Sequence, residues 1–315
     1  MDEPKIPKLI VITGPTASGK TGLGIRVAKA LDGEVVSADS MQIYKHMDIG
    51  TAKPTAEEMH GVRHHMLDIV PPWEDYSVAR YVEDASECID DILRRNKQPV
   101  IVGGTGLYID SLLAGRKFSA KGSAVLRRTL EAQYDSLGGE ALLRTLGELD
   151  PDSAAKLHLN DKKRIVRALE ICMATGMTIS KHDTESKTLP PRYAAYKFAL
   201  TFADRALLYM RIDSRVDDMI SGGLEDEVFS LLDMGVTPDC TAMQAIGYKE
   251  MFGAYQGSFS IDTAVEKIKM ESRRYAKRQL TWLRRDHEIG WITWETAPDT
   301  ERGAESVMEM LYEAE

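Results

Sequence analysis

The sequence predicts an α/β fold, a parallel sheet flanked by helices, with an all-helical insertion. Short apolar runs rich in β-branched residues alternate with longer amphipathic segments, which is typical of strand–helix–strand units. A glycine-rich loop joins the first of these runs to the first helix. Between residues 116 and 196 the sequence has no strong strand-like run, and its net charge changes sign. We therefore expect residues 1–115 and 197–315 to build the core and residues 116–196 to form the insertion.

Composition places the chain among ordinary globular proteins. It has 315 residues, 43% of them hydrophobic and 28% charged, which is enough apolar material for a large core. No apolar stretch approaches the roughly 18 residues of a membrane helix, and the short segment before the first strand leaves no room for a signal peptide. We expect a cytoplasmic protein without a membrane partner. The cysteines form no C-x-x-C pair, so we expect reduced thiols at Cys88, Cys172 and Cys240.

Five apolar runs predict the strands of the core. Each is short, and each is bounded by glycine, proline or polar residues. The first, KLIVI, leads into the glycine loop, and the second, EVVSAD, ends in an acidic residue. The predicted strands span residues 8–12, 34–39, 99–102, 196–202 and 291–294.

The helices of the core follow from apolar residues spaced three and four positions apart. Residues 77–95 show this spacing most clearly, because one buried face collects Tyr81, Ala85, Ile89 and Ile92. Comparable patterns predict further helices at residues 21–30, from about 206, at 264–285 and at 301–314.

The loop after the first strand matches G-x-x-x-x-G-K-[ST], the phosphate-binding P-loop. Strand, glycine loop and helix follow one another as the motif requires, so a chance glycine turn is the weaker interpretation. Backbone N–H groups of such a loop surround phosphate oxygens, and the helix N-terminus adds its positive dipole end. Lys20 adds a full charge, and the Thr21 hydroxyl is suited to Mg²⁺. The predicted diphosphate-binding residues are Gly14, Pro15, Thr16, Ala17, Ser18, Gly19, Lys20 and Thr21.

Two further loops converge on the same edge of the predicted sheet. Asp39 ends the second strand, and a glycine-rich loop with Thr105 follows the third. In an open α/β sheet, ligands bind outside the carboxyl ends of the strands. Asp39 and Thr105 are therefore expected to face the crevice that contains Lys20.

The insertion differs from the rest of the chain in charge. It carries fourteen Lys and Arg against ten Asp and Glu, a net charge of +4, whereas the whole chain carries −9 and the remainder −13. Asn160 to Arg167 is its most basic cluster. This cluster is either a solvated helix start or a surface that contacts a phosphate backbone. The negative charge of the whole chain argues only weakly against nucleic acid, because binding is local.

Other charged groups allow two interpretations each. Arg211 and Arg215 lie one helical turn apart and either close over phosphates or form ion pairs on an exposed face. The basic residues of 264–285 are either solvated or a second nucleic-acid stripe. The histidines 60, 64 and 65 lie close in sequence, but a packed or surface cluster is favoured over a metal site because the H-E-x-x-H glutamate is missing.

From these residues alone the chain is a P-loop α/β enzyme with a basic helical insertion. Two chemistries remain open. One is a small-molecule or nucleotide kinase with a helical lid. The other is a group transfer in which the P-loop holds a departing diphosphate.

A series of motifs resembles the tRNA dimethylallyltransferases, also called tRNA isopentenyltransferases. The blocks occur in that family's order and cover about residues 10 to 285. The absence of C-x-x-C, which eukaryotic members carry in a zinc finger, indicates the bacterial form. The matching blocks are GPTASGKT, SADSMQIYKHMDIGTAKP, HHMLDI, VGGTGLYI, NDKKRIVRALEI, AIGYKE and RRYAKRQLTWLRR.

The resemblance implies a P-loop NTPase-like core with a tRNA-binding insertion, and a reaction. Dimethylallyl diphosphate would donate its allyl group to N6 of adenine 37, beside the tRNA anticodon. Asp39 would be the general base, while Lys20, Arg215 and Mg²⁺ bound through Thr21 would hold the diphosphate. Thr105 would contact the flipped base or its backbone.

The same resemblance implies the contacts to tRNA. The anticodon stem-loop would be the partner, and a monomer the expected state. The implied tRNA-binding residues are Asp39, Ser40, Met41, Gln42, Thr105, Arg127, Asp161, Lys162, Lys163 and Arg164. A kinase and a non-catalytic tRNA-binding module remain the competing hypotheses.

Overall fold

The computed structural model describes residues 6–115, 123–181 and 191–314. It divides into two compact units, one formed by Met1–Gly115 with Arg192–Glu315 and the other by Arg116–Pro191. The second unit ends before the predicted boundary at residue 196, because the strand that follows already begins at Ala194.

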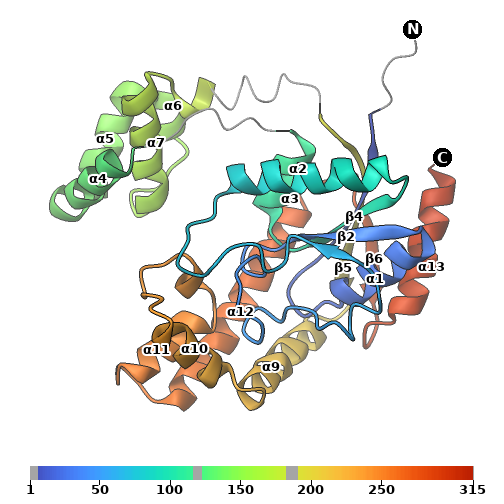
Figure 1. Ribbon diagram of the computed structural model, residues 1–315. Coiled ribbons are helices and arrows are strands. Elements are labelled where there is room, and N and C mark those ends of the chain that lie inside the picture. The colour runs from blue at the N-terminus through green and yellow to red at the C-terminus, as the bar shows by residue number, and fades with distance from the viewer. Residues whose placement is uncertain (1–5, 116–122, 182–190, 315) are drawn as a thin grey trace, which may run out of the picture. The chain divides into compact units, whose positions relative to one another are not determined.

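The first unit is built on a parallel sheet, as the sequence predicted, but with six strands instead of the five expected (Figure 1). The strand order is β3-β2-β4-β1-β5-β6, which leaves β1 inside the sheet with its following loop at the carboxyl edge. The two-residue strand β3 pairs with β2 and was not predicted, since two residues carry no periodic pattern. The strands are β1 (Lys8–Thr13), β2 (Gly33–Ala38), β3 (His64–His65), β4 (Gln98–Gly103), β5 (Ala194–Phe202) and β6 (Gly290–Trp294).

Helices cover both faces of this sheet. Alternate residues of the central strands point to opposite sides, so Ile10 and Val35 pack with α1 while Leu9 and Val36 belong to the core on the other face. The helices of this unit are α1 (Lys20–Ala30), α2 (Val78–Arg94), α3 (Gly106–Leu113), α9 (Arg205–Ser221), α10 (Leu224–Asp233), α11 (Tyr248–Tyr255), α12 (Ile261–Leu283) and α13 (Thr300–Glu313), with the short 3₁₀ helix η1 (Ala242–Gln244).

The second unit is helical throughout its described residues, 123–181. Its own small core joins Leu130, Leu142, Leu146, Ile165 and Leu169. The unit therefore folds around contacts among its own helices, which are α4 (Ala124–Leu137), α5 (Gly139–Leu149), α6 (Pro151–Ala154) and α7 (Lys162–Thr175). Within the described parts of both units, no helix is long and apolar enough to cross a membrane.

Candidate active site

The loop between β1 and α1 adopts a conformation that its glycines permit. Gly19 precedes α1 with φ at 88°, in the left-handed region that favours glycine. A Cβ atom there would also lie 2.9 Å from the Cβ of Pro298. Ala17 occupies the left-handed region without that freedom, at φ 62°. Such strain persists only where surrounding contacts impose it, and it is common at ligand sites.

Several of the contacts that hold this loop engage its carbonyl oxygens. Three side chains each donate a hydrogen bond to a different carbonyl: Lys20 to Pro15 at 3.4 Å, Arg211 to Ala17 at 3.1 Å and Trp294 to Ser18 at 2.9 Å. No side chain caps the N-terminus of α1. The first N–H groups of the helix therefore remain available to an anion.

Three neighbouring cavities share lining residues around this loop. The largest, of about 1030 Å³, is lined by Lys20, Thr21 and, from α9, Arg211 and Arg215. A cavity of about 330 Å³ is lined by Asp39, among others, and one of about 60 Å³ is lined by Lys20, Thr21, Asp39 and Arg215. Arg215 lines all three cavities. The structure thus brings together the four predicted site residues Lys20, Thr21, Asp39 and Arg215.

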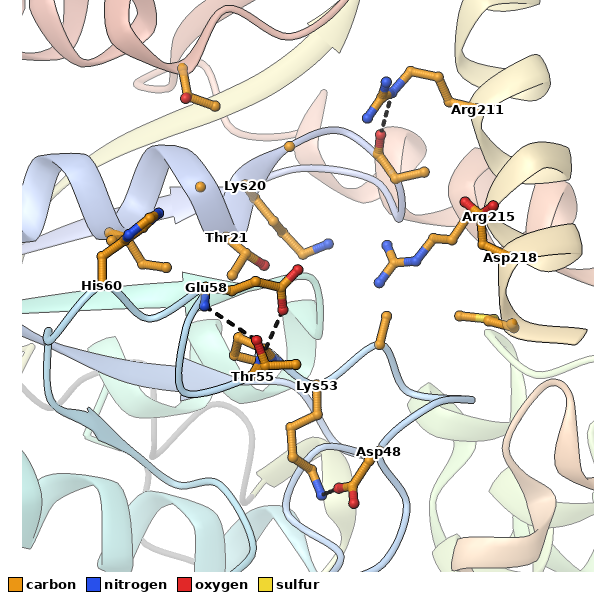
Figure 2. Close-up of a pocket in the computed structure, with 18 of the residues that line it drawn as sticks. Lys20, Thr21, Asp48, Lys53, Thr55, Glu58, His60, Arg211, Arg215 and Asp218 are labelled. Carbon is orange, nitrogen blue, oxygen red and sulfur yellow. Dashed lines mark hydrogen bonds and ion pairs between the residues drawn. The ribbon is translucent and has the colours of Figure 1, made fainter. Parts of the chain in front are cut away.

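Lys20 and Arg215 form an electrostatic arrangement that calls for an anion. Figure 2 shows their charged ends pointing toward one another from α1 and α9. Burial, and then the positive charge of Arg215, lower the pKa of Lys20 to about 8, against the opposing effect of Asp39. Burial also lowers the pKa of Arg215. Among the described residues Arg215 has no hydrogen-bonded or ion-paired partner. Two cations without a matching carboxylate partner favour a bound diphosphate or similar group.

Asp39 follows β2 and is held by its own backbone turn. One carboxylate oxygen, Oδ1, accepts hydrogen bonds from the N–H groups of Met41 at 2.9 Å and Gln42 at 3.4 Å. Thr105 closes the neighbouring loop: its hydroxyl accepts from the Ser40 N–H at 3.1 Å, and its own N–H donates to the Ala38 carbonyl at 3.1 Å. The carboxylate is therefore oriented while its other oxygen has no partner in the described chain.

Gln42 is engaged within the protein. Its Nε2 donates to the carbonyls of Thr51 and Ala52, each at 3.2 Å, and its Oε1 accepts from the Ser37 hydroxyl at 3.3 Å. Both amide hydrogens are thus used. A contact from this amide to tRNA, the partner that the family resemblance implies for Gln42, requires that one of these bonds be exchanged, so that role stays a prediction.

Two positioning residues were missed by the sequence analysis. Gln279, buried on α12, accepts from the Thr16 N–H at 2.9 Å and donates to the Gly104 carbonyl at 2.9 Å, linking two loops of the site. Glu227 on α10 accepts from three successive N–H groups, those of residues 48 to 50, at 2.8, 2.8 and 3.1 Å. A polar residue at a buried helical position was the available signal for Gln279, whereas the partners of Glu227 are too far away in sequence to be inferred.

The helical unit contains the remaining predicted residues. Arg127 donates to both carboxylate oxygens of Glu170, at 3.0 to 3.3 Å, and Glu170 is fully buried. Lys162 pairs with Asp135 at 2.5 Å, and Arg164 lies 3.8 Å from the carboxylate of Asp161. Lys163 is exposed and, within residues 123–181 of this unit, has no ion-paired partner.

The three histidines do not assemble a metal site. His64 engages the Val62 carbonyl through Nδ1 at 2.9 Å, while His65 engages Glu34 through Nε2 at 2.7 Å. His60 lines the largest cavity instead. No group of three or more His, Cys, Asp or Glu suited to a metal occurs among the described residues. His64 and His65 thus lie beside β2, while His60 and His64 line two different cavities.

Comparison with known proteins identifies the class. The family model described as IPP transferase matches residues 42–286, well over half of the chain. The chain belongs to this family of prenyl-transferring enzymes, which confirms the resemblance and the enzyme class inferred from the motifs.

Curated relatives and solved structures share the fold and most of the length. The tRNA dimethylallyltransferase of Thermoanaerobacter sp. (strain X514) is 47% identical over 287 residues, 90% of this chain and 91% of that one. The tRNA isopentenylpyrophosphate transferase of Bacillus halodurans is 40% identical with a TM-score of 0.72, covering 98% and 96%. A eukaryotic dimethylallyltransferase acting on tRNA is 31% identical with a TM-score of 0.77, covering 91% and 74%. These likenesses confirm the P-loop NTPase-like fold class.

The lowered pKa of Lys20 predicts pH-dependent anion binding. A bound diphosphate stabilises the ammonium form, so affinity is greatest below about pH 8 and falls as the pH rises through that value, by up to about tenfold per pH unit. Titration with an allyl diphosphate between about pH 7 and pH 9.5 measures this. Lys20→Arg should lose the dependence, because a guanidinium stays charged. The exposed Lys45→Met variant should keep it, because Lys45 lines none of the three cavities. A flat profile for the unmodified protein would contradict this prediction.

Replacement of Gln279 tests its link between loops. Gln279→Leu leaves the Thr16 N–H and the Gly104 carbonyl without that partner. We expect the free energy of unfolding to fall by about 2 kcal/mol or more, and diphosphate affinity to fall with it. Urea unfolding and pyrophosphate titration measure the two effects. Gln256→Leu, at an exposed position, serves as control, and equal behaviour of the two variants would show that the link is unimportant.

Proposed function

We propose that this protein transfers a dimethylallyl group from dimethylallyl diphosphate to N6 of adenine 37 of tRNA. The observation that supports this most is the order of groups along the cavities. Lys20, Thr21 and Arg215 line the large and small cavities, and Asp39 lines the small and intermediate ones. A diphosphate held by the cations therefore places its carbon substituent toward a carboxylate that can receive a proton.

On the donor side, the residues stabilise a leaving group. Breaking the allylic C–O bond leaves negative charge on the diphosphate and develops positive charge on carbon. The uncapped N–H groups at the start of α1 would act as donors to this negative charge, together with Lys20 and Arg215, whose charged ends face one another in Figure 2. Donors arranged before the reaction need no reorganisation during it, which is how such sites lower the barrier.

On the acceptor side, the adenine N6 attacks the allylic carbon and loses a proton. Asp39 is the proposed acceptor of that proton, through the oxygen that its turn leaves without a partner. Ser40, Met41 and Tyr275 line the same cavity of about 330 Å³, and an aromatic ring suits a base that has left its stack. The Thr105 hydroxyl fixes the position of this segment by accepting a hydrogen bond from the Ser40 N–H.

A divalent cation fits the donor side. The Thr21 hydroxyl lines both diphosphate-side cavities and makes no hydrogen bond to any described residue, which leaves it available as a ligand. Hydroxyl and phosphate oxygens are ligands that Mg²⁺ prefers. Thr21 would hold the ion, which when bound supplies positive charge to the leaving diphosphate.

The helical unit is the proposed contact surface for the tRNA anticodon stem-loop. Its sequence is net basic while the rest of the chain is net acidic, and phosphate contacts supply much of the affinity for nucleic acid. The buried Glu170 holds Arg127 and Arg167 in one place while both side chains stay partly exposed. The cluster from Asp161 to Arg164 begins α7 beside the exposed Lys163.

Substitution of Asp39 tests the proposed reaction. Asp39→Asn removes the proton acceptor and nearly preserves shape, so transfer should fall by about 10²- to 10⁴-fold while diphosphate affinity changes little. Labelled dimethylallyl transfer into unmodified tRNA, followed by mass measurement of the released nucleosides, tests both the product and the loss. Unmodified protein that consumes ATP on a small molecule and leaves tRNA unprenylated would instead support a kinase. Binding of tRNA with no turnover would support the non-catalytic hypothesis.

A salt titration tests the contact surface. Lys163→Ala should weaken tRNA binding and reduce the slope of log affinity against log salt by about 1, because one phosphate contact is lost. Arg144→Ala is a matched control, since Arg144 lies in the same unit near Glu140. An unchanged slope for Lys163→Ala would remove that residue from the surface.

A further inference from the structure

The smallest cavity descends from Asp39 along one face of the sheet. Side chains alternate along a strand, so Val35, Ser37 and the following Asp39 lie on the same face. All three line the cavity of about 60 Å³. Its opening therefore lies beside the proposed proton acceptor, and its interior extends past Ser37 to Val35.

Residues that the strand register places side by side form the lower end of this cavity. Val35 is paired with His64 of β3, and Ser37 with Val102 of β4, and each of these residues also lines the cavity. Val35 and Val102 belong to the hydrophobic core beneath α1. Gly24 of α1 lies so close that a Cβ atom there would stand 2.4 Å from Cγ2 of Val102. Two buried valines, Val35 and Val102, thus form the apolar part of the floor.

The imidazole of His64, which lies in this lower wall, is uncharged. His64 engages the Val62 carbonyl through Nδ1, and burial lowers the pKa of its imidazole. Its buried Nε2 has no partner among the described residues. A neutral ring beside two valines leaves the floor without a formal charge, while Lys20, Asp39 and Arg215 are the charged groups that line the cavity.

We propose that this cavity receives the branched end of the donor's tail and that Val35 limits that tail to one isoprene unit. This inference rests on the proposed function. An apolar cavity of roughly 150 Å³ holds one benzene ring. A cavity of about 60 Å³ therefore accepts only the end of a short branched chain, with the reacting carbon at the opening between the diphosphate site and Asp39. A second isoprene unit would clash with Val35 and the core residues beneath it.

Neighbouring residues of β2 provide matched variants. Val35→Ala deepens the cavity, whereas Val36→Ala removes the same atoms from the opposite face of the strand. We expect Val35→Ala to raise the ratio of kcat/KM for geranyl diphosphate to kcat/KM for dimethylallyl diphosphate by about tenfold or more, since a few methyl groups in an apolar pocket change selectivity by this order. Val36→Ala should leave the ratio unchanged.

A larger side chain tests the same wall in the other direction. Val35→Ile should lower kcat/KM for dimethylallyl diphosphate while inhibition by inorganic pyrophosphate stays the same, because the diphosphate site is not altered. This variant keeps the test open if Val35→Ala does not fold.

The outcomes distinguish a wrong assignment of this cavity from a wrong proposed function. An unchanged donor ratio in folded Val35→Ala, an equal change in Val36→Ala, or a Val35→Ile variant that keeps full activity with dimethylallyl diphosphate overturns the assignment of this cavity. In each case the unmodified protein still prenylates tRNA. Failure of the unmodified protein to transfer an allyl group from either donor overturns the proposed function itself.

Discussion

Two positive charges face one another, and neither forms an ion pair with a carboxylate among the described residues; this is the constraint on which the site depends. Lys20 and Arg215 come from helices far apart in sequence, and each loses hydration by lying in the cavity wall. Buried charges are costly unless an opposite charge accompanies them. The folded first unit holds both side chains in place despite this desolvation cost. An anionic ligand then supplies the missing negative charge.

Side chains on helices and strands hold the loops of the site in place by hydrogen bonds to the loop backbone. Gln279 joins the P-loop to the loop after β4, and Trp294 and Arg211 hold P-loop carbonyls. Glu227 holds the loop that follows the Asp39 segment. Each of these side chains lies on a helix or strand of the same unit. Loops held in this way keep their N–H groups and charged side chains oriented before a ligand arrives, which is the condition for electrostatic catalysis.

Much of the core was predictable because its signals are local. The P-loop requires glycine at particular positions, and Gly19 indeed adopts a left-handed conformation next to Pro298. Long strands and helices show their periodicity in any short window, so β1 and α12 were predicted nearly in place. The strand β3 was missed because its two residues are defined only by pairing with β2.

The sequence by itself determined the class of fold, the phosphate-binding loop and the family, since these depend on the order and spacing of residue types along the chain. Only the tertiary structure decided which groups meet. It engaged the Gln42 amide with Thr51 and Ala52 and set Arg127 against the buried Glu170. It also placed Arg215 opposite Lys20 with no ion-paired partner among the described residues. The depth of the cavity below Asp39 was likewise decided by the register of three strands. Contacts of this kind join residues far apart in sequence, so no local pattern records them.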